Sequence, residues 1–117
     1  MQARAESLNT HSVDDVFRAL ADPTRRHVLE RLGRSPASVS ELAKPFDMAL
    51  PSLLQHLKIL EGSGLVSSGK TGRVRTYRLV PQRMREAEDW LAKQRTLWTT
   101  RLDQLDSYLL ELKETST

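Results

Sequence analysis

Residues 38–63 read SVSELAKPFDMALPSLLQHLKILEGS, and this stretch decides the fold. Ser38 and Glu41 have the S-x-x-E spacing of a capping box, which predicts the start of a helix. That helix must be short, because Pro45 has no backbone N–H to donate and would break a longer one. After the connector DMAL, a second helix is predicted over about residues 50–63. Two short helices joined by a turn predict a helix-turn-helix, a motif whose second helix lies in the major groove of DNA.

The second helix has an apolar side and a polar side. Four leucines are spaced to face the core: Leu53, Leu54, Leu57 and Leu60. Four polar residues are left as candidate DNA-binding residues: Ser52, Gln55, His56 and Lys58. Gln55 is the best candidate to read a base edge, because an amide can grip adenine with one donor and one acceptor. The alternatives for Gln55 are a solvated helix face and contact with phosphate or water alone. His56 either donates to a phosphate or packs beside Leu57 as a satisfied histidine.

A basic hairpin is predicted directly after this helix. Residues 65–80 read LVSSGKTGRVRTYRLV, with two strand-like runs around a turn, SGKTGR. Three cations are candidates for contact with DNA phosphates or a narrow minor groove: Lys70, Arg73 and Arg75. The alternative is a turn whose charges only keep it soluble. Arg78 is expected near the strand end, where it can pair with an acid.

The positive charge of the chain is gathered in this middle segment. Residues 49–80 carry five cations and one acid, a net charge of +4. Residues 1–48 carry seven of each and balance, while residues 82–117 carry six cations and seven acids, a net of −1. A local basic patch is the electrostatic footprint expected where phosphates dock.

Helices are also predicted on both sides of this region. Near the N-terminus, a flexible segment over residues 1–11 precedes a helix from about Ser12, and a second helix follows from Asp22 with a proline in its first turn. Arg25 and Arg26, at the start of this second helix, are expected to form a structural salt bridge. Residues 82–112 contain no glycine or proline and predict one long helix. Apolar residues recur along it in heptads, which is typical of a helix–helix seam.

This apolar seam is too large for one helix to hide alone. Either the long helix folds back on its own core, or it forms a subunit interface together with the first helix. The interface residues predicted by the second alternative are Val13, Val16, Phe17, Leu91, Trp98, Leu102, Leu105 and Leu109.

Composition excludes several classes of protein. At 117 residues, with 28% charged and 38% apolar residues, the chain is predicted to be one soluble globular domain. It has no apolar run of about 20 residues for a membrane span and no secretory signal, so a cytoplasmic location is expected. The absence of cysteine excludes disulfides and thiolate metal sites. His11, His27 and His56 lie on different elements and predict no metal site, and no cofactor is expected. No catalytic elbow or phosphate loop is present, so the chain is not expected to be an enzyme.

Three stretches resemble the ArsR-type winged-helix repressors: ADPTRRHVLERL, SVSELAKPFDMALPSLLQHLKILEGSGLV and GKTGRVRTYRL. They span about residues 13–80, and the tail WLAKQRTLWTTRLDQLDSYL resembles the last helix of a branch that does not sense metals. The resemblance implies a homodimer that binds a palindromic operator, usually as an autorepressor. The family has a histidine at the position of His56. Leu54 and Ala49, however, stand where the family usually has serine.

The predicted fold is therefore mainly α with a small β-hairpin, in the order α-α-α-α-β-β-α. Residues 12–81 form the winged helix-turn-helix region, and residues 82–112 form a C-terminal dimerisation helix. The predicted function is sequence-specific binding of operator DNA by a transcriptional regulator that occludes polymerase. The alternative is a winged-helix adaptor that binds protein instead of DNA. The sequence identifies no effector.

Overall fold

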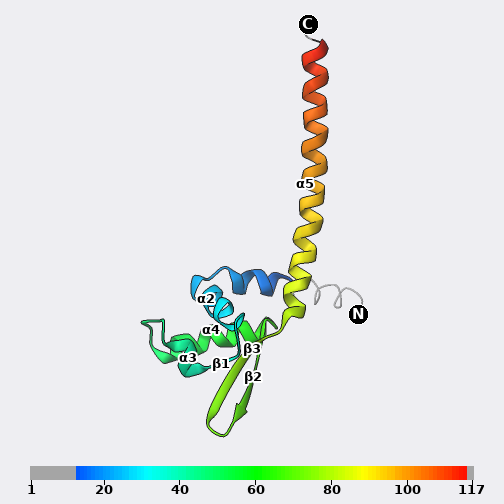
Figure 1. The fold of residues 1–117 in the computed structure, drawn as a ribbon. Coiled ribbons are helices and arrows are strands. Elements are labelled where there is room, and N and C mark those ends of the chain that lie inside the picture. Colours follow the sequence, from blue (N-terminus) through cyan, green and yellow to red (C-terminus); the bar gives the residue numbers. More distant parts are fainter. Residues whose placement is uncertain (1–12, 116–117) are drawn as a thin grey trace, which may run out of the picture. The chain divides into compact units, whose positions relative to one another are not determined.

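The computed structural model describes residues 13–115 (Figure 1). They form a helix over residues 13–20, α2 (Pro23–Leu32), β1 (Ala37–Ser38), α3 (Val39–Ala43), α4 (Leu50–Gly62), β2 (Val66–Thr71), β3 (Val74–Leu79) and α5 (Pro81–Thr115). The winged helix-turn-helix predicted from the sequence is confirmed. The predictions of a flexible segment at residues 1–11 and of a helix start at Ser12 lie outside the described residues.

One strand was missing from the prediction. The hairpin is part of a three-stranded antiparallel sheet with the strand order β1-β3-β2. In this sheet Ala37 pairs with Tyr77 and Ser38 with Thr76. The predicted order α-α-α-α-β-β-α was therefore incomplete, because it lacked β1. Through its pairing, β1 holds the start of α3 against the middle of β3.

The capping box at the start of α3 is present as predicted. The Ser38 hydroxyl accepts the Glu41 backbone N–H at 3.2 Å, and a Glu41 carboxylate oxygen accepts the Ser38 backbone N–H at 3.3 Å. Hydrogen bonds from the Ser38 backbone and side chain hold the pKa of Glu41 below its usual value. The helix ends at Ala43, two residues before Pro45, as the missing N–H of proline requires.

The core is built around one stripe of α4. Leu53, Leu57 and Leu60 are buried at the spacing i, i+4, i+7. They share a single cluster with residues of every neighbouring element, including Val16, Val28, Leu32, Leu42, Leu65, Val66 and Tyr77. Leu54 was predicted to face this core, but its side chain is 42% exposed. The prediction was wrong because the buried stripe of α4 is narrower than the leucine pattern suggests.

The chain divides into two compact units, with the boundary between Ala87 and Glu88, inside α5. The predicted long helix over residues 82–112 is present and extends slightly at both ends, to Pro81 and Thr115. Among the described residues, no helix combines the length and apolar character needed to cross a bilayer.

Asp22 caps α2 and generates a prediction about pH. Its Oδ2 accepts the Arg25 backbone N–H at 3.0 Å. Partial burial acts to raise the pKa of Asp22, but this hydrogen bond and the charges of His56 and Arg25 hold it below its usual value. We expect Asp22→Ala to lower the free energy of unfolding by about 1 kcal/mol at neutral pH, because the cap is lost.

Asp22→Asn is the control, since it keeps a capping side chain and removes only the charge. Because the folded-state pKa lies below the unfolded value of about 3.9, the charge-dependent stabilisation is complete above that value. It is lost as the pH falls through the folded-state pKa. Urea denaturation should therefore separate wild type from Asp22→Asn at neutral pH and bring them together in acid. An unchanged difference across that range would contradict the assignment.

Candidate nucleic-acid interface

The exposed side of α4 presents the polar residues predicted to contact DNA. An α-helix turns by about 100° per residue, so Gln55, two residues from both Leu53 and Leu57, lies on the opposite side from that buried pair. Ser52 and Lys58 are also exposed. The side chain best able to read a base edge therefore projects directly away from the core.

Two leucines of α4 are exposed on the flank between the buried stripe and Gln55. Leu50 is 53% exposed and Leu54, one turn later, is 42% exposed. They form an apolar ridge beside a polar one, a feature that the sequence analysis missed. The signal was present, because Leu54 lies about 100° from Leu53 and only one of two adjacent residues can face directly inward.

His56 turns away from Gln55, toward α2. Its Nδ1 lies 3.1 Å from Nη1 of Arg25 and 3.7 Å from Oδ2 of Asp22. The side chain is 23% exposed. Nδ1 of His56 is therefore engaged within the protein. This agrees with the alternative in which His56 is a histidine with its hydrogen bonding satisfied by the protein.

The arginines at the start of α2 bind carbonyl oxygens. Arg25 donates from Nε to the Ala19 carbonyl at 2.8 Å and from Nη2 to the Arg18 carbonyl at 3.0 Å. Arg26 donates to the Leu20 carbonyl at 2.7 Å. The role is structural, as predicted, but the expected salt bridge is wrong. The partners are the last carbonyls of the helix at residues 13–20, which have no acceptor role within that helix.

The hairpin, here called the wing and comprising β2 and β3, has a tight basic tip. Thr71 pairs with Val74, so Gly72 and Arg73 form a two-residue loop. Gly72 has a φ of +62°, the left-handed value that the first position of a type II′ hairpin turn requires. Lys70 and Arg75 lie directly opposite each other just behind this loop. The predicted turn SGKTGR is thus shorter than expected, and Gly69 belongs to β2.

Both of these paired cations are on the wing face that is turned toward α4. Side chains two residues apart share a face of a strand, so Lys70 goes with Ser68, and Arg75 with Tyr77. The Ser68 hydroxyl donates to the carboxylate of Glu61 on α4 at 3.1 Å, and Arg75 donates to the Ser68 oxygen at 2.9 Å. This chain of hydrogen bonds links the wing to the helix. Burial and then the negative charge of Glu61 raise the pKa of Tyr77.

Arg78 lies on the other face of the wing. Its Nε donates to the hydroxyl of Ser67, its cross-strand neighbour, at 3.2 Å. The expected pairing with an acid is replaced by a bond to serine.

Comparison with known proteins connects this geometry to a family. A helix-turn-helix domain family matches residues 20–68. The crystal structure of an ArsR family transcriptional regulator is 53% identical, superposes with a TM-score of 0.74, and is matched over 77% of this chain and 93% of that one. The chain belongs to the ArsR family of transcriptional regulators.

Two further proteins resemble this chain in sequence or in fold. The transcriptional regulator Rv2034 of Mycobacterium tuberculosis is 43% identical over 70 residues, which are 60% of this chain and 65% of that protein's length. The homodimeric winged helix-turn-helix DNA-binding domain of Mb0332 from Mycobacterium bovis has a TM-score of 0.62 at 23% identity, covering 79% of this chain and 87% of that one. That last likeness shows the winged helix-turn-helix fold.

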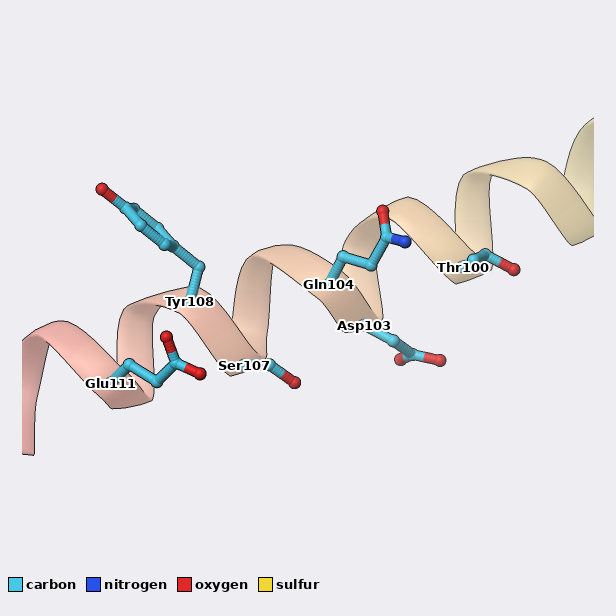
Figure 2. Close-up of a pocket in the computed structure, with 6 residues that line it drawn as sticks. All are labelled: Thr100, Asp103, Gln104, Ser107, Tyr108 and Glu111. Atoms are coloured by element: carbon cyan, nitrogen blue, oxygen red, sulfur yellow. The ribbon is translucent and has the colours of Figure 1, made fainter.

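The second unit of this ArsR family member is a two-sided helix. Five residues predicted to form a subunit interface are between 50% and 66% exposed in the single chain: Leu91, Trp98, Leu102, Leu105 and Leu109. Figure 2 shows a polar groove on the same helix, lined by Thr100, Asp103, Gln104, Ser107, Tyr108 and Glu111. By helical geometry five of these groove residues lie on the side opposite to the heptad leucines, and Tyr108 lies on the flank between the two sides.

The first helix offers fewer exposed apolar residues for an interface than the sequence suggested. Val16 is fully buried in the core of the single chain, so its predicted place at a subunit interface is corrected. Val13 and Phe17 are partly exposed and stay candidates. Within residues 13–115, no group of three or more His, Asp or Glu side chains is placed to hold a metal ion.

The pair formed by Lys70 and Arg75 generates a prediction about stability. Like charges directly opposite each other destabilise an antiparallel pair by about 0.2–1 kcal/mol. We expect Lys70→Thr to raise the free energy of unfolding by about 0.5 kcal/mol at low ionic strength. The gain should shrink in molar salt, because salt screens repulsion between exposed charges and leaves the β-propensity of threonine unchanged. Denaturation at two salt concentrations measures this, and an equal gain in both would argue against repulsion.

Proposed function

We propose that this ArsR family regulator binds a palindromic operator as a homodimer and represses transcription, its own included, by occluding polymerase in the cytoplasm. The observation that supports this most strongly is the common orientation of α4 and the wing. Gln55 projects away from the core, and the wing cations Lys70 and Arg75 lie on the face turned toward that helix. A helix entering the major groove thus has phosphate-binding cations beside it.

Within this proposal the exposed side of α4 reads bases. The Gln55 amide pairs with adenine through its donor and acceptor, and the apolar side chain of Leu54 beside it suits contact with a thymine methyl group. Ser52 and Lys58 contact the sugar-phosphate backbone. Lys70, Arg73 and Arg75 hold the flanking phosphates or enter the minor groove.

An adaptor that binds only protein is the alternative function, and salt dependence separates the two. Binding through several phosphates releases counterions, so log affinity should fall steeply against log salt concentration. Docking through an apolar face should give a shallow slope. Selection of bound sites from random duplexes by the purified protein tests the proposal directly, and a two-fold symmetric sequence is the expected winner.

Gln55→Ala should relax the sequence preference of the protein. At the selected operator we expect a loss of about 1–3 kcal/mol in binding free energy, because a bidentate base contact disappears. Arg73→Ala is the matched control, since it should weaken binding to cognate and unrelated duplexes about equally and lower the salt slope. Fluorescence anisotropy with both duplexes measures these effects. If Gln55→Ala changes neither affinity nor preference, the proposed role of Gln55 fails.

The apolar seam of α5 should hold two chains together. Four exposed leucines and Trp98 line this seam. Together they carry more apolar surface than a soluble monomer usually presents in one stripe. We expect wild type to sediment as a dimer at micromolar concentration and Trp98→Glu with Leu102→Glu to sediment as a monomer. Gln104→Glu with Ser107→Glu adds the same two negative charges in the polar groove of Figure 2 and should stay dimeric. A dimer in all three samples would remove this seam from the interface.

A further inference from the structure

Arg25 joins three helices through one guanidinium group. Its Nε and Nη2 bind the carbonyls of Ala19 and Arg18 at the end of the helix over residues 13–20. Its remaining terminal nitrogen, Nη1, lies 3.1 Å from Nδ1 of His56 on α4. Arg25 itself belongs to the first turn of α2. The side chain is therefore held at a fixed place by two carbonyls before it meets the histidine.

This contact determines which nitrogen of His56 carries the proton. A guanidinium group stays protonated and has only donors, so the Nδ1 atom facing it must be the acceptor. The neutral imidazole then carries its hydrogen on Nε2. Within residues 13–115 no buried side-chain nitrogen or oxygen lacks a hydrogen-bond partner, and His56 bonds only through Nδ1. Its Nε2–H therefore reaches the surface.

We propose that Arg25 is a positioning residue that holds His56 as an Nε2–H donor to a DNA phosphate. The proposal rests on the proposed function in DNA binding. His56 directly follows Gln55 and lies about 100° from it around α4, so it faces the flank of the groove where phosphates lie. Both alternatives for His56 then hold at once, because one ring nitrogen is satisfied within the protein and the other is a free donor.

The position of Asp22 predicts what happens to His56 when Arg25 is removed. Its Oδ2 lies 3.7 Å from the same Nδ1 atom. Without the Arg25 guanidinium, this carboxylate becomes the nearest partner, and a carboxylate can only accept. The proton would then move to Nδ1 and leave Nε2 as a bare acceptor. A lone pair facing a phosphate repels it, so loss of Arg25 should weaken DNA binding without any direct contact between Arg25 and DNA.

Nitrogen-15 NMR of the imidazole rings of the full-length protein reads the protonation site directly. In wild type at mildly alkaline pH, we expect the Nε2–H form at His56. Arg25→Met should shift His56 to the Nδ1–H form, and Arg25→Lys should restore part of the Nε2–H signal. A helical circular dichroism spectrum like that of wild type shows that each variant folds. The Nδ1–H form in wild type would overturn the proposal.

Two substitutions at His56 keep the proposal testable if Arg25→Met does not fold. The amide nitrogen of glutamine reaches the position of Nε2, whereas that of asparagine reaches only the position of Nδ1. We expect His56→Asn and His56→Ala to lose about tenfold in affinity for the selected operator, the effect of one hydrogen bond to a charged group. His56→Gln should recover most of it. Equal losses in His56→Gln and His56→Asn would overturn the proposal.

The outcomes separate this inference from the function on which it rests. If wild type binds no duplex at low ionic strength, the proposed function fails, and the inference fails with it whatever the tautomer. If wild type binds a symmetric operator through Gln55 but the His56 variants do not differ from one another, only the inference fails. A methylphosphonate duplex that removes one phosphate charge at a time should abolish the advantage of His56→Gln at a single position in each half-site.

Discussion

Burial of Leu53, Leu57 and Leu60 is the constraint on which the rest of the molecule depends. These side chains fix the rotation of α4 about its own axis, because they are the only stripe of that helix in contact with the core. Truncating a buried leucine costs about 2–5 kcal/mol, so rotation by one residue, which would expose this stripe, is strongly disfavoured. The outward direction of Gln55 follows from this burial alone. Packing of the three leucines therefore forces the polar side of α4, which we propose reads DNA, to face solvent.

In the wing, by contrast, the arrangement of charges does not favour stability. Two like charges lie opposite each other, and selection for stability alone would remove one of them. Lys70 faces Arg75 across the strands, and Glu61 of α4 is linked to Arg75 through the Ser68 hydroxyl. The hairpin tolerates this repulsion because its base is anchored. Tyr77 is buried there, and β1 pairs with the same strand. A strongly anchored base with a charged tip is what a phosphate-binding element needs, because the tip remains cationic without unfolding the sheet.

The features that could be predicted from the sequence are local ones. The capping box of Ser38 and Glu41 and the helix stop before Pro45 each follow from residues within a few positions of one another, and so does the heptad pattern of α5. The missed features depend on distant partners. The strand β1 has only two residues, too few for an alternating pattern, and it forms by pairing with β3 about 40 residues later. Likewise the carbonyl partners of Arg25 have no side-chain signature, so an acid seemed the natural partner.

Arg25 also shows why the exposed face of α4 is coupled to the rest of the first unit. The helix over residues 13–20 contains Val13 and Phe17, which stay candidates for the subunit interface, and its last carbonyls bind Arg25. Arg25 in turn holds His56 on α4. The hydrogen bonds of Arg25 therefore link the end of a helix proposed to meet the second subunit to the helix proposed to meet DNA. Arg25 thereby fixes the end of that helix relative to α4, so in the proposed dimer the geometry of association would set where the two α4 helices lie. An operator with half-sites one helical turn apart requires the two α4 helices of the dimer to lie about 34 Å from each other.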